Sequence, residues 1–114
     1  MPPDRSMSRG FDIFYNQGDQ MGIKVQVKVF AMLRNHMEKE VEVDMAERAN
    51  VTQLLDLLIS RHPGVADELF MSPGVFKPYV NILKNGRNIS FINGMDTTLE
   101  DKDVIAIFPP VAGG

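Results

Sequence analysis

The chain has 114 residues, of which 44% are hydrophobic, and its length and composition fit one small globular domain. A net charge of −3 offers no basic surface for nucleic acid, and the absence of cysteine excludes disulfides, thiolate metal sites and cysteine nucleophiles. No apolar run approaches the roughly 20 residues of a membrane helix and no signal peptide is visible, so we expect a cytoplasmic protein without nucleic acid or membrane partners.

The first twenty residues, MPPDRSMSRGFDIFYNQGDQ, differ from the rest of the chain. They are rich in Pro, Gly, Ser, Asp and Gln and have no sustained hydrophobic period. We interpret residues 1–20 as a disordered leader, expression-derived or misassigned, with a native regulatory arm as the alternative. A domain then starts at Met21.

Two stretches alternate with the period of a β-strand. In Ile23 to Phe30 the isoleucine and valines face one side, which predicts a half-buried strand, and only Phe30 departs from the otherwise polar opposite side. Glu38 to Val43 alternates again, with its glutamates on the solvated side. Asn35 to Lys39 is the predicted turn of a first hairpin.

The segment NVTQLLDLLISRHPG predicts a helix. Asn50 and Gln53 have the spacing of a capping box, and apolar residues recur at helical intervals after them. Pro63 and Gly64 should end this helix. VADELF, from Val65, is interpreted as a further short helical turn.

The last third of the chain predicts three strands. Asn85-Gly86 lies between two apolar-alternating runs and is typical of a type I′ hairpin turn. A polar turn at Glu100 to Asp103 precedes a final strand, Val104 to Phe108. The order strand, strand, helix, strand, strand, strand predicts an α+β fold, a mixed sheet with one main helix packed across it.

No set of side chains in this sequence indicates an active site or a metal site. His36 and His62 lack partners at metal-ligand spacing, so both are interpreted as surface or loop-end residues. Asp101 and Asp103 could form an acid/base pair, but their place in a turn favours hydrogen bonding to the local backbone. Without a nucleophile and its base, we do not expect an enzyme with its own active site.

The end of the sequence, IFPPVAGG, predicts an extended tail over residues 109–114. Pro109 and Pro110 should stop the last strand and stiffen the chain, which could reach roughly 20 Å when extended. Val111 and Ala112 follow, and the small Ala112 keeps the tail thin. Gly113-Gly114 can pass through a channel that admits no Cβ. Such a tail would suit a partner enzyme that must reach the terminal carboxylate inside a buried pocket. The alternative is a flexible terminus with chance glycines.

From Met21 onward the sequence resembles the MoaD/ThiS family of ubiquitin-like sulfur carriers. The resemblance rests on VFAMLR, LLDLLISRHPG, VNILKNGRNI and LEDKDVIAIFPPVAGG, and it is nearest to archaeal MoaD-type proteins, a group that overlaps the archaeal ubiquitin-like small modifiers. It implies the β-grasp fold for residues 21–108. The family's usual Asp-Gly-Asp turn reads Asp101-Lys102-Asp103 here, so this turn could differ in type.

The resemblance also implies a chemistry for Gly114. An adenylating enzyme of the ubiquitin-activating type (MoeB-like) would use ATP to activate the C-terminal carboxylate, which then becomes a thiocarboxylate. The sulfur would pass to a pterin on the large subunit of molybdopterin synthase (MoaE-like), in molybdenum or tungsten cofactor biosynthesis. The chain itself would bind no cofactor.

Two other roles remain open for the same terminus. The first is a modifier joined through Gly114 to lysines of other proteins. The second is a ThiS-type donor for thiazole synthesis, which FPPVAGG matches less well.

Phe30 and Phe108 are further candidates for partner binding. We expect both on an exposed apolar patch, because exposed aromatic residues often anchor interfaces. The alternative is that the twist of the sheet buries them in the core.

Overall fold

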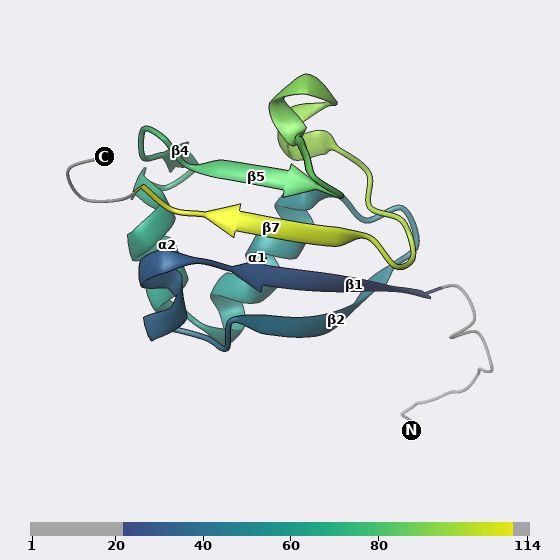
Figure 1. Cartoon of the computed structure of the whole chain (residues 1–114), viewed down its shortest axis with the longest axis horizontal. Helices are drawn as coiled ribbons and strands as arrows, with labels where there is room; N and C mark the ends of the chain where they lie inside the picture. The colour runs from purple at the N-terminus through teal and green to yellow at the C-terminus, as the bar shows by residue number, and fades with distance from the viewer. Residues whose placement is uncertain (1–21, 111–114) are drawn as a thin grey trace.

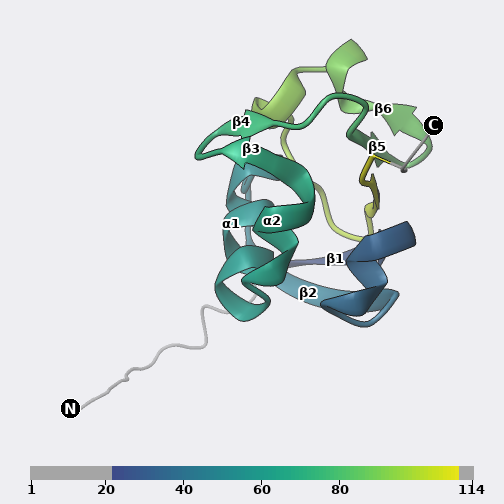
Figure 2. The same cartoon turned by 90° about the vertical axis from the view of Figure 1, so that its left-hand side faces the viewer.

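The computed structural model describes residues 22–110 and consists of one layer of strands covered on one face by helices (Figures 1 and 2). The strands and helices, with η for 3₁₀-helices, are β1 (Gly22–Val29), η2 (Ala31–Asn35), β2 (Glu40–Ala46), α1 (Val51–Arg61), α2 (Gly64–Leu69), β3 (Phe70–Ser72), β4 (Val75–Phe76), β5 (Asn81–Lys84), β6 (Arg87–Asn88), η3 (Ile89–Phe91), η4 (Gly94–Asp96) and β7 (Val104–Phe108).

The main sheet has the strand order β2-β1-β7-β5-β6. β7 pairs in parallel with β1, placing Val27 beside Ile105, and antiparallel with β5, placing Ile82 beside Ile107. The last strand of the chain therefore lies in the middle of the sheet (Figure 1). This mixed sheet with one main helix confirms the predicted α+β, ubiquitin-like β-grasp fold.

The first hairpin follows the predicted alternation. Val25 pairs with Val43 and Val27 with Val41, and three of these four valines are fully buried. The predicted turn at residues 35–39 is too short, because η2 also belongs to the connection. The chain leaves β1 at Phe30 and adopts a left-handed conformation at Ala31 (φ 55°), and Leu33 of η2 then enters the core.

Helix α1 begins at the predicted capping box. The Asn50 side chain accepts a hydrogen bond from the Gln53 amide (2.9 Å), and the Gln53 side chain accepts one from the Asn50 amide (2.9 Å). Both backbone amides would otherwise lack a hydrogen-bond acceptor within the helix. The helix buries its apolar stripe against the sheet, namely Val51, Leu54, Leu55 and Leu58. Helix α2 follows at Gly64 and confirms the short helical turn expected there.

A small second sheet, β3 and β4, was not predicted. Its two strands flank Pro73-Gly74, with Gly74 in a left-handed conformation (φ 77°). The rings of Phe70 and Phe76 stack across it at 4.6 Å. Strands of two or three residues are too short for alternation to show in the sequence.

The second predicted hairpin is confirmed at its turn and shorter than expected beyond it. Asn85 and Gly86 both have positive φ (51° and 86°), as a type I′ turn requires. β6 ends after two residues, since the Asn88 side chain accepts a hydrogen bond from the Ser90 amide (2.9 Å) and begins η3. This local bond competes with further pairing along the strand.

The turn before β7 has the geometry of a glycine turn although it contains none. Lys102 is exposed and has φ 71°, in the left-handed region, while its amide donates to the Lys24 carbonyl (2.7 Å). Lys102 therefore carries the steric strain that glycine would avoid at this position.

We therefore expect Lys102→Gly to stabilise the domain by about 1 kcal/mol, because removing the Cβ relieves that strain. The free energy of unfolding, measured by urea denaturation, checks this. Lys102→Ala is the matched control, since it removes the same charge and keeps the Cβ. Equal stabilities for the two variants would show that the backbone at residue 102 is not strained.

Candidate functional site

The C-terminal end of β7 is the point from which the predicted tail leaves the sheet. β1 ends on one side of it and β5 begins on the other. Phe108 is the last residue of β7 and is half-buried. Its neighbours Ile105 and Ile107 are fully buried against the helices, so the Phe108 side chain lies on the opposite, outer face of the sheet.

Phe30 and Phe108 stack on each other at this place. Their ring centroids are 4.3 Å apart and the ring planes differ by 7°. The Arg34 guanidinium lies 5.1 Å from the centroid of the Phe30 ring, and its Nε donates to the Val29 carbonyl (3.0 Å). A cation–π contact therefore supports the stack from the side of η2.

The exposure of this pair falls between the two expectations from the sequence. Phe30 and Phe108 are both half-buried: they cover each other and remain open to one side. They are neither core residues nor freely exposed ones. The stack leaves a preformed aromatic surface beside the tail, and its role in docking stays a prediction.

The rest of the outer face divides into an apolar and a charged part. Val104 and Ala106 of β7 and Leu83 of β5 are half-buried and continue the apolar surface from Phe108. Towards the β2 edge the face becomes charged. There Lys24 bonds Asp44 (3.0 Å), and this hydrogen bond, together with the negative charge of Asp44, raises the pKa of Lys24.

The first residue of the predicted tail belongs to the domain. Pro109 is buried and Pro110 half-buried, so packing continues one residue past the predicted boundary at Phe108. The remaining predicted tail residues, Val111, Ala112, Gly113 and Gly114, lie outside the described residues. Their proposed roles therefore stay predictions.

Asp101 and Asp103 serve the turn, as interpreted from the sequence. Asp101 accepts a hydrogen bond from the Lys24 amide (2.8 Å). The buried Asp103 carboxylate accepts from the Asn85 side chain (2.8 Å) and the Glu100 amide (2.7 Å), and lies 3.4 Å from Lys84 Nζ. With its oxygens occupied in this way, Asp103 is a structural residue.

The two histidines lie apart from the tail exit. His36, the C-cap of η2, forms a hydrogen bond with Glu68 of α2 (3.1 Å). The His36 ring also packs closely on Gly64, where an added Cβ would lie 2.1 Å from His36 Nδ1. His62 is the C-cap of α1. Within residues 22–110 no three His, Asp or Glu side chains come together as a metal site.

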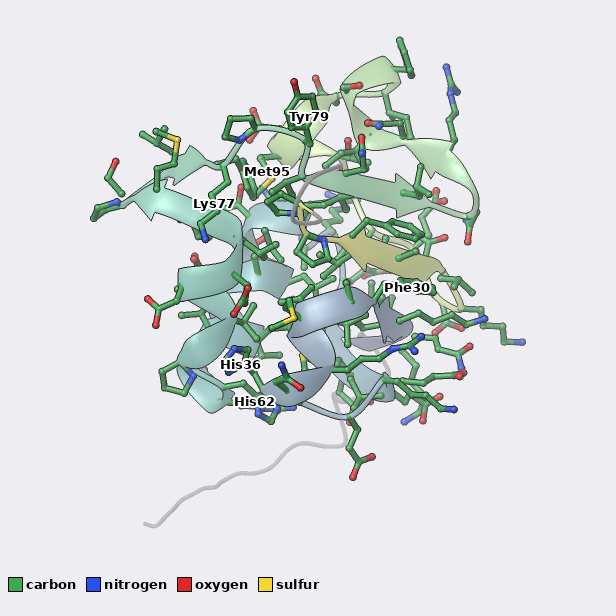
Figure 3. All side chains as sticks on the ribbon, turned by 60° about the vertical axis from the view of Figure 1, so that its left-hand side comes forward. Phe30, His36, His62, Lys77, Tyr79 and Met95 are labelled. Carbon is green, nitrogen blue, oxygen red and sulfur yellow. The ribbon has the colours of Figure 1, made fainter. Side chains whose placement is uncertain are left out.

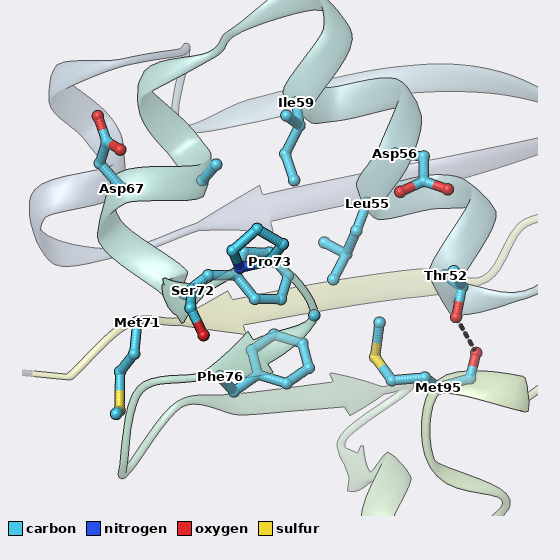
Figure 4. A pocket seen from close by; sticks show the side chains of 13 residues that line it. Thr52, Leu55, Asp56, Ile59, Asp67, Met71, Ser72, Pro73, Phe76 and Met95 are labelled. Atoms are coloured by element: carbon cyan, nitrogen blue, oxygen red, sulfur yellow. Dashed lines mark hydrogen bonds between the residues drawn. The ribbon is translucent and has the colours of Figure 1, made fainter.

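A groove of about 760 Å³ lies on the helical side, between α1, α2 and the β3–β4 hairpin (Figure 4). Its walls are mainly apolar, with Leu55, Ile59 and Phe76 among them, and Thr52 donates to the Met95 carbonyl at one end (3.1 Å). Sequence reasoning missed this groove because it missed β3 and β4.

No helix in the described part of the chain has the length and apolar character needed to cross a membrane.

Comparison with known proteins places this fold and tail in one family. The ThiS family model matches residues 27–114. The small archaeal modifier protein 3 of Haloferax volcanii is 37% identical over 93 residues, covering 81% of this chain and 100% of that protein.

Two solved structures are also similar. One is the solution structure of a Haloferax volcanii protein, with 34% identity and a TM-score of 0.72 over 94% of this chain and 100% of that one. The other, from Pyrococcus furiosus, is a putative molybdopterin converting factor, subunit 1, with 34% identity and a TM-score of 0.62 over 78% of this chain and 99% of that one. The chain belongs to the ThiS family of ubiquitin-like sulfur carriers, and its relatives include archaeal small modifier proteins.

Proposed function

We propose that the chain is the sulfur-carrying small subunit of molybdopterin synthase. The observation that carries the proposal is the tail exit, where the central strand ends beside a preformed aromatic stack and leads directly into PPVAGG. The similarity to the Pyrococcus furiosus molybdopterin converting factor supports this choice within the family.

The proposed chemistry takes place on the Gly114 carboxylate. A carboxylate oxygen attacks the α-phosphorus of ATP and pyrophosphate leaves, which converts a poor electrophile into an acyl-adenylate. A hydrosulfide ion then attacks the acyl carbon, AMP leaves with the electrons of the C–O bond, and loss of the S–H proton leaves a thiocarboxylate. The adenylating enzyme and the sulfur donor supply the catalytic groups. This chain supplies the C-terminal carboxylate and the surface that binds these partners.

The Phe30–Phe108 stack is the proposed docking surface for these partners. We expect Phe108→Ala to weaken binding to the activating enzyme by about 30-fold, as loss of an aromatic interface anchor does. Its cost in stability should be only about 1 to 2 kcal/mol, because the ring is half-buried. Titration calorimetry and urea denaturation measure the two effects.

Phe76→Ala is the matched control for this prediction. Phe76 is also half-buried and stacked on another phenylalanine, but it lies on the helical side of the domain. It should lose similar stability and keep its affinity. If both variants lose affinity equally, unfolding explains the effect and the docking surface is wrong.

A single-turnover assay tests the molybdopterin synthase role. The thiocarboxylated chain is mixed with the large subunit of molybdopterin synthase and the cyclic pterin phosphate. We expect sulfur to appear in the pterin and the free carboxylate to return at Gly114. Retention of the thiocarboxylate in the presence of active large subunit would contradict this role.

The second candidate function is protein modification, favoured by the similarity to small archaeal modifier protein 3. In this case a lysine amine attacks the same activated acyl carbon, AMP leaves and an isopeptide forms. Mass spectrometry of tryptic peptides from cell extract distinguishes this fate. Lysines carrying the C-terminal residues of this chain indicate a modifier, and their absence alongside free thiocarboxylate indicates a carrier.

A further inference from the structure

Tyr79 is a highly exposed aromatic residue with a strained backbone. Its exposure is 78%, the largest among the big hydrophobic side chains of the described residues. Its φ is 69°, in the left-handed region that bulky L-residues avoid. The ring gains little burial in return for this conformation.

Two side-chain hydrogen bonds hold this conformation. The Asn81 side chain donates to the Tyr79 carbonyl (3.3 Å), and the Asn88 side chain donates to the Asn81 side-chain oxygen (3.0 Å). Residues from β5 and β6 thus hold the backbone while the ring remains in solvent. Strain that is maintained by neighbours and not repaid by packing is common at functional sites.

The position of Tyr79 relates it to the tail. β5 pairs antiparallel with β7, and Asn81 lies opposite Phe108. Tyr79 comes two residues before Asn81 in the turn that leads into β5, and its carbonyl accepts the Asn81 hydrogen bond, so it lies next to the end of β5 that pairs with Phe108. Phe30 lies on the other side of β7, next to β1, so the two aromatic residues flank the strand that carries the tail (Figure 3).

We propose that Tyr79 is a specificity-determining contact for the adenylating enzyme, on the β5 side of the tail exit. This inference rests on the proposed function. An enzyme that encloses the tail must also cover the residues on both sides of the end of β7, where the tail begins. We choose the adenylating enzyme because the carrier and the modifier functions share the adenylation step. The ring of Tyr79 packs on an apolar wall of that enzyme while its hydroxyl bonds a polar group at the mouth.

The test is ATP–pyrophosphate exchange by the cognate adenylating enzyme at increasing concentrations of the full chain. For Tyr79→Gly we expect a KM at least tenfold higher with a similar kcat. The melting temperature of Tyr79→Gly should rise by roughly 4 to 8 °C, because glycine relieves the left-handed strain. A purely structural role for Tyr79 cannot produce a more stable variant that binds less well.

Two further variants locate the effect. Asn81→Ala should raise KM in part, because it releases the Tyr79 backbone and leaves the ring in place. Phe91→Ala is the matched control: Phe91 is also an exposed aromatic (74%), but it lies on η3, beyond the outer edge of β5 and away from the end of β7 (Figure 1). Its KM should equal that of the wild type.

The outcomes separate this inference from the proposed function. If the wild type supports exchange and Tyr79→Gly has the same KM, or if Phe91→Ala raises KM as much, the Tyr79 contact is wrong and the proposed function stands. If the wild type neither supports exchange nor binds the enzyme, both are wrong.

Discussion

Deletion of Gly114, the substitution Gly113→Val and a C-terminal tag should each abolish thiocarboxylate formation in the presence of ATP and the cognate activating enzyme. In the proposed function, adenylation converts the C-terminal carboxylate into an electrophile, and no side chain can replace that group. We expect Gly113 to pass through a narrow channel next to the reacting phosphate, where even a methyl group would clash. Product is measured by intact-mass analysis after a timed reaction.

Stability should barely change in these three variants, by less than about 0.5 kcal/mol, because the altered positions lie outside the core that the sequence predicts. The same tag placed at residue 1 is the matched control and should leave the yield unchanged. Full activity of the C-terminally tagged chain, with the tag still attached, would contradict both the carrier and the modifier function.

Asp103→Ala should cause the largest loss of stability among the polar residues of the domain, about 3 kcal/mol in the free energy of unfolding. The Asp103 side chain is only 5% exposed. Its removal leaves the Asn85 amide and the Glu100 N–H without their acceptor, and it withdraws one of the two carboxylates near the largely buried Lys84.

Asp101→Ala is the matched control for this loss. Asp101 belongs to the same turn but is exposed, and it accepts one backbone hydrogen bond, from Lys24. Its loss should cost less than about 1 kcal/mol. Urea denaturation of the two variants checks the difference. Similar values would mean that the Asp103 network contributes no more than an ordinary surface turn.

Where a local rule acts within a few residues, the sequence was sufficient to predict the fold. The alternation from Ile23 to Val29 predicts β1, the Asn50–Gln53 capping box predicts the start of α1, and Asn85-Gly86 predicts the hairpin turn. The capping box and the hairpin turn are satisfied by neighbours in the chain. The alternation of β1 can be recognised within eight residues, although its valine face packs on the core.

Features that depend on distant contacts could not be predicted. Phe30 and Phe108 are 78 positions apart, so their stacking follows only from the parallel pairing of β1 and β7. The burial of Pro109 and the strain at Tyr79 likewise depend on the surroundings of the sheet end. The sequence predicted Phe30 and Phe108 as candidate partner-binding residues, and the structure shows that their rings stack on each other. The roles of these two residues and of the tail residues stay predictions.

The most direct test of the central claim is intact-mass analysis of the chain isolated with its native terminus. We expect a species heavier than the unmodified chain by one oxygen-to-sulfur exchange, located at Gly114 by fragmentation and absent when ATP or the activating enzyme is withheld. Recovery of only the unmodified carboxylate, after reaction with an active enzyme, ATP and a sulfur donor, would contradict the claim that this chain carries sulfur.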